Sequence, residues 1–375
     1  MKILLATSVV MAWPYIQELT DELEGQGAKV TLLNINDVGR LPLITRLAFK
    51  AGIVGRCPAL RRRAFVAAVE HRLSLMPSDF DVINIHFADP IFAQLTPALK
   101  RHGRALVTTI WGADFLLADP AGLDALARIF TASDAVTSNN PEVSRKICAW
   151  RPETADQIRI VRFGLRSLDV ITQLTGSESR EETLNKLGLP QGKTVVACGY
   201  NAIREQNHFI MAEAFATLSP SARSKLFALL PMTYPADPSY VQEVRSAVEQ
   251  SGIEFSIIDE TQSIDYICRT RIASDYAVNI QTTDSLSASI QEHMFAGSNM
   301  IVGAWLPYGV FEELGVPLRR VYDAADIAAL LETAAASGAP NRSRPAYSAK
   351  LYDYASWRAN IGEWLALYES FQRAA

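Results

Sequence analysis

The stretch TTDSLSASIQEHMFAGSNMIVGAWLPY, residues 282–308, determines the fold that this sequence predicts. An apolar segment typical of a buried strand, Asp275–Ile280, precedes it, and small polar residues follow the carboxylate of Asp284. Gly297 ends a helical pattern, and a second strand-like segment begins at Asn299. Strand, turn, helix, glycine and strand together predict a βαβ unit.

The small residues in the turn indicate a phosphate site at the N-terminus of the predicted helix. Backbone N–H groups at Ser287, Ala288 and Ser289 would be available there to bind an anion. Glu292, inside the helix, could accept hydrogen bonds from the hydroxyl groups of a ribose, as acidic residues do in other nucleotide-binding folds. The alternative is an ordinary βαβ unit with a capping Asp284 and a solvent-facing Glu292.

The spacing of the two acidic residues resembles a known donor site. Asp284 and Glu292, separated by seven residues and followed by HMFAG at 293–297, resemble the nucleotide-sugar site of GT-B glycosyltransferases, especially the retaining family four. The resemblance implies that Asp284 contacts the donor sugar, that Glu292 binds the ribose, and that the backbone at Ser287 and Ala288 holds the diphosphate. Asp284 replaces the usual Glu of that family, which shortens the reach to the sugar.

Length and composition indicate two globular domains. The 375 residues exceed the ~150 expected for one domain, and an apolar fraction of 49% is enough for two cores. The net charge of −4 argues against nucleic-acid binding. Four cysteines without a CxxC pair suit a reducing compartment, the cytoplasm. No apolar run approaches the ~20 residues of a membrane span, and the apolar start is interpreted as a buried strand, not as a signal peptide.

Apolar strands alternate with helical patterns, which predicts parallel sheets covered on both faces, the α/β class. We expect strands at Lys2–Thr7, Lys29–Ile35, Asp81–His86, Ala105–Trp111, Ala135–Ser138, Ile158–Phe163, Thr194–Gly199, Lys225–Pro231, Glu254–Ile258, Asp275–Ile280, Asn299–Gly303 and Arg319–Tyr322. The pattern therefore predicts two doubly wound, Rossmann-like domains.

The alternation pauses at residues 166–192, a polar stretch with a short helical pattern that we interpret as a linker. We expect an N-terminal, acceptor-side domain over residues 1–165 and a C-terminal nucleotide-sugar donor domain over residues 193–345. The aromatic-rich tail, residues 346–375, is expected to be helical. The GT-B resemblance implies that this helix crosses back to the N-terminal domain and that the two domains face a cleft.

A second candidate donor loop is GYNAIREQNH, residues 199–208, which follows the first strand of the second half. Family four has an Arg and a Lys in this loop that neutralise the diphosphate, but this chain has Tyr200 in place of the Arg and Gln206 or Asn207 in place of the Lys. Arg204 supplies the fixed charge of the loop and could bind phosphate through two parallel hydrogen bonds. The alternative for Arg204 is a solvated loop residue.

The segment PMTYP, residues 231–235, together with the pair Asn207-His208, resembles glycosyltransferase family 56, the fucosaminyltransferases of enterobacterial common antigen synthesis. The resemblance implies that Tyr234 and Asn207 lie at the donor. It also implies inversion at the sugar, whereas the family four resemblance implies retention, so the stereochemistry stays open. The alternative is a rigid proline turn at a strand end.

The N-terminal half contributes candidates at the carboxyl ends of two predicted strands, where ligands of open α/β sheets bind. His86 ends one strand, and Trp111, Gly112 and Asp114 follow the next. Asp114 could orient an acceptor hydroxyl or act as a base, and His86 is the other catalytic candidate. Many family four members have His where Trp111 stands, while others have a Trp-Gly-Ser-Asp variant, so Trp111 and Gly112 are assigned to the acceptor side. The alternative for His86 is a structural role.

No metal is expected, because the helix dipole and basic residues carry the phosphate charge in GT-B enzymes. Asp79-Phe-Asp81 matches the D-x-D metal motif of another glycosyltransferase fold, but it precedes a strand instead of following one. A basic, partly apolar segment, Arg46–Arg63, is a candidate for contact with an anionic membrane surface, where a polyprenyl-linked acceptor would lie. The alternative is a solvated helix pair.

These observations favour a metal-independent glycosyltransferase that needs no cofactor. It would move a sugar from a nucleotide-diphosphate sugar to a glycan or polyprenyl-linked acceptor in bacterial surface polysaccharide synthesis, in the cytoplasm or on the inner face of the membrane. The alternatives are a nucleotide-sugar epimerase of the same fold and a non-catalytic partner that binds a nucleotide sugar or a glycan. The sequence names neither the base, nor the sugar, the acceptor or the oligomeric state.

Overall fold

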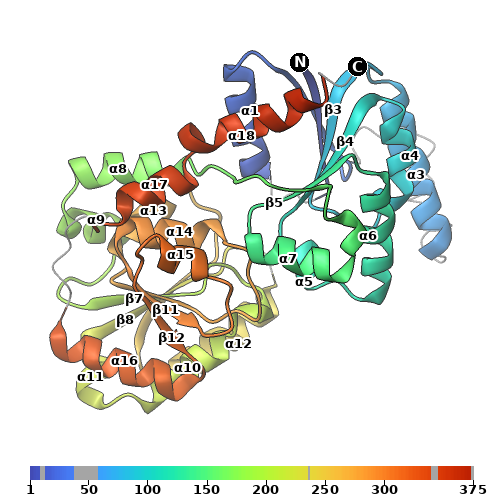
Figure 1. The fold of residues 1–375 in the computed structure, drawn as a ribbon. Helices are drawn as coiled ribbons and strands as arrows, with labels where there is room; N and C mark the ends of the chain where they lie inside the picture. The colour runs from blue at the N-terminus through green and yellow to red at the C-terminus, as the bar shows by residue number, and fades with distance from the viewer. Residues whose placement is uncertain (9–12, 38–57, 235–236, 339–344, 373–375) are drawn as a thin grey trace. The chain divides into compact units, whose positions relative to one another are not determined.

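The computed structural model describes residues 1–8, 13–37, 58–234, 237–338 and 345–372. The chain folds into two compact units (Figure 1). The first combines Met1–Gly164 with Trp357–Ala375, and the second is the continuous segment Leu165–Ser356. Each unit is built around its own parallel sheet.

The first unit has a sheet with the strand order β2-β1-β3-β4-β5-β6, in which every pairing is parallel. Its strands are β1 (Lys2–Thr7), β2 (Lys29–Asn34), β3 (Phe80–His86), β4 (Gly103–Ile110), β5 (Ala135–Ser138) and β6 (Ile158–Ile160). Its helices are α1 (Trp13–Gly25), α3 (Pro58–Ser74), α4 (Phe92–Lys100), α5 (Ala113–Leu116), α6 (Pro120–Ala132), α7 (Pro141–Trp150) and α18 (Trp357–Ser370), with a 3₁₀ turn at Pro152–Thr154. Apolar residues of the central strands β1, β3 and β4 enter cores on both faces of the sheet, which is why apolar side chains occur on both sides of these strands.

The C-terminal helix α18 belongs to the first unit. Trp364 and Tyr368 are fully buried in the same core as Ile16 and Leu19 of α1, and Figure 1 shows α18 beside α1. The indole Nε1 of Trp364 donates to the carbonyl oxygen of Arg162 at 2.9 Å. The expected return of the C-terminal helix to the N-terminal domain is therefore confirmed.

A ladder of buried polar side chains crosses the first sheet and ends on α18. Thr137 Oγ1 donates to Thr109 Oγ1 at 2.8 Å, and Thr109 donates to Asn84 Oδ1 at 2.9 Å. The amide Nδ2 of Asn84 then donates to the phenolic oxygen of Tyr368 at 2.8 Å. Since unpaired buried polar groups are costly, this ladder specifies where α18 lies on the sheet.

The second unit has a parallel sheet with the order β12-β11-β10-β7-β8-β9. Its strands are β7 (Thr194–Cys198), β8 (Leu226–Pro231), β9 (Glu254–Ile258), β10 (Tyr276–Asn279), β11 (Asn299–Gly303) and β12 (Leu318–Val321). Its helices are α8 (Ser167–Ser177), α9 (Arg180–Leu187), α10 (His208–Thr217), α11 (Pro220–Lys225), α12 (Pro238–Ser251), α13 (Ile264–Ala273), α14 (Ala288–Ala296), α15 (Gly309–Glu313), α16 (Ala324–Ser337) and α17 (Ser348–Ala355), with a 3₁₀ turn at Arg204–Gln206. The strand order reverses between β7 and β10, and ligands of doubly wound folds bind beyond the strand ends at such a reversal.

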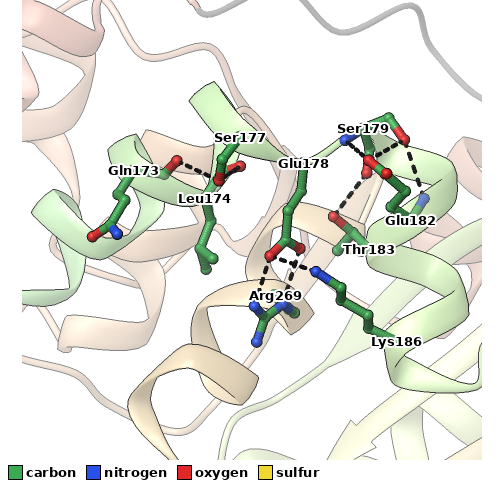
Figure 2. A network of polar contacts seen from close by, with 9 residues as sticks. All are labelled: Gln173, Leu174, Ser177, Glu178, Ser179, Glu182, Thr183, Lys186 and Arg269. Atoms are coloured by element: carbon green, nitrogen blue, oxygen red, sulfur yellow. Dashed lines mark hydrogen bonds and ion pairs between the residues drawn. The ribbon is translucent and has the colours of Figure 1, made fainter.

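Residues 166–192 are part of the second unit instead of the linker that the sequence predicts. They form α8 and α9, which both pack on α13. Glu178, between these helices, accepts hydrogen bonds from Arg269 Nε at 3.0 Å and Nη2 at 2.7 Å, and lies 2.9 Å from Lys186 Nζ (Figure 2). Ser179 and Glu182 form a reciprocal capping box. The polar composition of the stretch therefore serves helix ends and an ion-pair network.

The predicted helical tail is divided at Ser356. Helix α17 before it remains in the second unit, where Tyr352 Oη donates to Asp169 Oδ1 at 2.6 Å, while α18 joins the first unit. The backbone N–H of Leu165 donates to the carbonyl oxygen of Ala355 at 2.8 Å, so the two ends of the second unit lie side by side. All the expected strands are present with small shifts at their ends, and the two Rossmann-like domains are confirmed.

Candidate functional site

The loop between β10 and α14 in the second unit follows one of the two strands at the reversal of the sheet. Leu286 has the left-handed backbone (φ +59°) and is buried. Gln291 Nε2 donates to the carbonyl oxygen of Leu286 at 2.8 Å, which supports this conformation. Ser287 is the N-cap of α14 but forms no side-chain capping bond. The first N–H groups of the helix, at Ala288 and Ser289, therefore receive no cap from Ser287.

Asp284 is buried at the start of this loop, and its Oδ2 accepts two hydrogen bonds. Tyr308 Oη donates at 2.5 Å and the backbone N–H of Ser287 at 3.1 Å. Burial raises the pKa of Asp284, while these hydrogen bonds oppose the rise. Tyr308, itself fully buried, also accepts from Asn279 Nδ2. The sequence interpretation did not single out Tyr308, which reaches Asp284 from the loop after β11.

Glu292 is only 6% exposed, so the alternative of a solvent-facing Glu292 is wrong. Its Oε2 accepts from Arg271 Nε at 3.0 Å, and both side chains are buried. Arg271 Nη1 lies 3.4 Å from His293 Nε2. Arg271 comes from α13, and no spacing pattern in the sequence connects it to Glu292.

The loop after β7, the other strand at the reversal, is joined by side-chain hydrogen bonds to the loop after β10. Gln281 Oε1 accepts from Tyr200 Oη at 3.0 Å and from Gln206 Nε2 at 2.8 Å. Asn207 has a left-handed backbone (φ +59°), and its Nδ2 donates to the carbonyl oxygen of Ile280 at 2.7 Å. Gly199 is required here, because a Cβ atom would lie 2.8 Å from Gln206 Oε1. Asn207 therefore connects the two loops through its side chain.

The charge of Arg204 is paired with a carboxylate, that of Glu243 on α12. Its guanidinium forms two hydrogen bonds to Glu243, at 3.0 and 3.1 Å, and stacks 4.6 Å above the ring of Tyr240. The pair is exposed to solvent. Because Glu243 occupies the Nη1 and Nη2 edge of the guanidinium, Arg204 could bind a phosphate through that edge only by leaving Glu243.

Two partly exposed aromatic side chains follow strands of the second sheet. Tyr234 comes after β8 and is 38% exposed. Trp305 comes after β11 and is 44% exposed, and its Nε1 donates to the carbonyl oxygen of Gln281 at 2.8 Å. Trp305 was not among the predicted site residues. Its position just beyond the carboxyl end of a predicted strand could have identified it as a candidate, because ligands of open α/β sheets bind there.

In the first unit, His86 ends β3 inside an aromatic enclosure. Its ring stacks on Trp364, with centroids 5.6 Å apart, and lies near Trp111 and Phe163. Neither ring nitrogen has a hydrogen-bond partner among the described residues, and the same holds for Trp111 Nε1. Burial lowers the pKa of His86 to about 3, so the imidazole is neutral at physiological pH.

Asp114 accepts hydrogen bonds from three backbone N–H groups in the loops after β3 and β4. Ala88 and Gly112 donate at 2.9 Å and Trp111 at 3.0 Å. Burial raises the pKa of Asp114 to about 6 against the effect of these bonds. Gly112 suits this turn because its φ is +110°. In this structure the carboxylate joins two loops, and its role as a base stays a prediction.

The D-x-D sequence at Asp79–Asp81 lies at the amino end of β3. The backbone N–H of Lys2 donates to Asp81 Oδ2 at 2.7 Å and its ammonium pairs with Asp79, so both carboxylates of the D-x-D sequence have partners at the strand entry. Across the described residues, no group of His, Cys, Asp and Glu could hold a metal ion, and no helix is long and apolar enough to span a bilayer. Most of the basic segment, residues 46–57, lies outside the described residues.

Comparisons with known proteins support the interpretation of the fold. Residues 13–165, less than half of the chain, match the sequence model of Glycosyltransferase Family 4. The sucrose-phosphate synthase of Thermosynechococcus elongatus is similar over 100% of both chains, with a TM-score of 0.72 and 14% identity. HepE of Anabaena, in complex with UDP and glucose, is similar over 99% of both chains, with a TM-score of 0.68 and 14% identity.

A third similar structure is the UDP-forming α,α-trehalose-phosphate synthase of Burkholderia vietnamiensis, with a TM-score of 0.68 and 13% identity over 100% of both chains. No curated protein sequence matches this chain. The chain therefore has the GT-B fold of two Rossmann-like domains, and the family match supports a glycosyltransferase.

Proposed function

We propose that this protein is a glycosyltransferase that moves a sugar from a nucleotide-diphosphate sugar to a glycan or polyprenyl-linked acceptor. The observation that carries the proposal is the loop and helix after β10, at the reversal of the second sheet. Asp284 is oriented there by Tyr308, and the N-terminus of α14 lacks a side-chain cap from Ser287. The match of residues 13–165 to family four gives independent support.

The proposed reaction breaks the bond between C1 of the donor sugar and the diphosphate and forms a bond between C1 and an acceptor oxygen, while the proton of the acceptor hydroxyl passes to the departing diphosphate. The N–H groups of Ala288 and Ser289 would stabilise the negative charge that develops on the diphosphate, whereas the N–H of Ser287 already donates to Asp284. Glu292 would hold the ribose, and Asp284 the sugar hydroxyls. The transition state would have oxocarbenium character, as in other reactions at glycosidic carbon.

The finer part of the proposal is retention of configuration, no metal requirement, and a role in bacterial surface polysaccharide synthesis at the inner face of the membrane. The family four match supports retention, whereas the local likeness to family 56 would imply inversion. Proton NMR of the product distinguishes the two through the coupling constant of the anomeric proton. Activity that survives EDTA treatment would support metal independence.

A thermal-shift screen tests donor binding. UDP is the first nucleotide to try, since HepE and the trehalose-phosphate synthase are described with UDP or as UDP-forming; GDP, dTDP, ADP and CMP complete the set. A ligand at about 100 times its dissociation constant should stabilise the folded state by about 2.7 kcal/mol. The shift should be lost in Glu292→Gln and kept in Glu254→Gln, a surface change at the opposite, amino end of the second sheet.

Two results would contradict the proposal: no shift with any of the five nucleotides, or a shift of equal size in Glu292→Gln. Product analysis distinguishes the alternatives. An epimerase would convert the free nucleotide sugar without an acceptor, and a non-catalytic partner would bind it without turnover. A glycosyltransferase releases nucleoside diphosphate only as sugar is transferred to an acceptor or to water.

A further inference from the structure

Trp305, in the loop after β11, has an exposed side chain that its neighbours fix in place. Its indole is 44% exposed, yet it is held in one orientation by the surrounding structure. Nε1 donates to the carbonyl oxygen of Gln281 at 2.8 Å. A Cβ atom at Gly303 would lie 2.6 Å from Trp305 Cζ2, so the indole rests directly on the bare backbone at the end of β11.

The loop that bears Trp305 is held as well. Arg320 Nη1 donates to the carbonyl oxygens of Ala304 at 3.1 Å and Leu306 at 3.4 Å, the residues on either side of Trp305. The guanidinium of Arg320 is oriented in turn by two hydrogen bonds to Glu312, at 3.0 and 2.9 Å. A rigid, exposed aromatic side chain binds a partner at little entropic cost, because its orientation is already restricted.

The contacts around α14 indicate which end of a bound donor would meet the indole. Glu292, the proposed ribose ligand, pairs with Arg271 on α13, which assigns the nucleoside end to that side of the helix. Asp284, the proposed sugar ligand, is bonded to Tyr308 in the loop after β11. Trp305 belongs to that same loop and bonds to Gln281, which begins the loop before α14. Under the proposed function, the loop that bears Trp305 is therefore the one that reaches the sugar ligand Asp284.

We propose that Trp305 is a stacking platform for the sugar of the donor, and that the donor carries a hexopyranose with one face of C–H groups turned to the indole. This inference rests on the proposed function and adds a specificity residue to it. The polar groups of the site, Asp284 above all, would bind the hydroxyl edge of the same ring. An aromatic face and a carboxylate together match the two chemical faces of a pyranose.

The test compares two ligands on the same protein by isothermal titration calorimetry. The probes are UDP, GDP, dTDP and ADP, each with its glucose conjugate, and the pair that binds the wild type most tightly is followed in the variants. Trp305→Ala should bind the nucleoside diphosphate as the wild type does but the glucose conjugate about tenfold more weakly, the size expected for loss of one aromatic contact. Trp305→Phe, which keeps an aromatic ring, should lose less.

Tyr322→Ala is the matched control, because Tyr322 is a 77% exposed aromatic residue at the end of the outermost strand, β12. Gly303→Ala gives a second route: the added methyl group displaces the indole without removing it and should also weaken only the glucose conjugate. Equal weakening of both ligands in Trp305→Ala would overturn the proposal, because the indole would then contact the nucleoside diphosphate. Unchanged affinities would overturn it too. Absence of nucleotide binding in the wild type would refute the proposed function itself.

Discussion

Asp114 and Glu292 show how single buried charges are balanced in this protein. Asp114 is served by backbone N–H groups from two loops, whereas Glu292 has one guanidinium partner, Arg271. The spacing of Asp284 and Glu292 could be read from the sequence because both lie in one βαβ unit. Arg271 and Tyr308 could not, since their contacts arise only when α13 and the loop after β11 are packed against that unit.

The raised pKa of Asp114 predicts a specific pH dependence. Its pKa is about 6 in the folded state and ordinarily 3.8, so the folded state holds the proton more tightly than the unfolded chain. The contribution of this group to stability is therefore complete below about pH 4 and is lost as the pH rises through 6. Urea denaturation at several pH values should show that the stability of the wild type relative to Asp114→Asn decreases over that range. A constant difference would contradict the prediction; Asp124→Asn, at an exposed position, is the control.

The buried pair of Glu292 and Arg271 predicts an asymmetric mutational result. Glu292→Gln leaves the Arg271 charge buried without its partner and should lower the free energy of unfolding by about 3–5 kcal/mol. The double variant Arg271→Met with Glu292→Leu should recover most of that loss, since no charge remains buried. The exposed pair of Lys193 and Glu254 is the control, and Glu254→Gln should cost less than about 1 kcal/mol. Additive losses in the double variant would refute this account.

At the scale of elements, the strands of both sheets could be predicted because most are rich in apolar residues and lie between helical patterns, although the edge strands β6 and β12 contain arginines. A short helical pattern was recognised in residues 166–192, but the stretch was interpreted as a linker, and the packing of α8 and α9 within the second unit was not predicted. Their apolar residues, among them Leu168, Ile171 and Leu184, are buried but separated by polar positions, and the network at Glu178 supplies part of the attachment to α13. The break between α17 and α18 at Ser356 was also not evident, because aromatic residues continue on both sides.

The network of Figure 2 predicts that Arg269 and Lys186, which carry the same charge, contribute differently to the free energy of unfolding. Arg269 contacts both oxygens of Glu178, whereas Lys186 makes one contact and is half exposed. Arg269→Met should therefore reduce the free energy of unfolding more than Lys186→Met, in chemical denaturation at pH 7. Equal losses would show that only the net charge matters.

The same network should make the stability that Glu178 contributes depend on pH in the acid range. Hydrogen bonds from Arg269 and Lys186 lower the pKa of Glu178 from 4.5 to about 2. The folded state therefore holds the proton less tightly than the unfolded chain, and the stabilisation is present above about pH 4.5 and lost as the pH falls towards 2. The difference in stability between wild type and Glu178→Gln should shrink over that interval; a difference that stays constant down to pH 2 would exclude the ion pairs as its source.

At the scale of the whole molecule, the second unit should fold without the first. Its ends are joined by the hydrogen bond between Leu165 and Ala355, and it has its own core. A fragment of residues 165–356 should unfold cooperatively in urea and, under the proposed function, keep the nucleotide-induced thermal shift. Residues 1–164 alone should be unstable, because Trp364 and Tyr368 of α18 would be missing from their core.

A short linker from Gly164 to Trp357 should rescue the first unit, since a Cβ atom at Gly164 would lie 2.4 Å from the Cα of Trp357. Circular dichroism and urea denaturation of the joined fragment, residues 1–164 with 357–375, provide the measurement. The unlinked fragment 1–164 is the comparison. Equal stability of the two fragments would show that α18 contributes nothing to the first unit.

The split of the first unit around the second also determines the order in which the protein can mature on the ribosome. Residues 1–164 leave the exit tunnel first, but the helix that closes one face of their sheet is translated after residue 356. The second unit is continuous in sequence, so it can fold completely before Trp357–Ser370 is synthesised. The first unit cannot complete its fold until that helix has been made. A helix made after the second domain thus completes the domain whose synthesis began before it, and a chain released before Trp357 would carry a finished second domain with an unfinished first one.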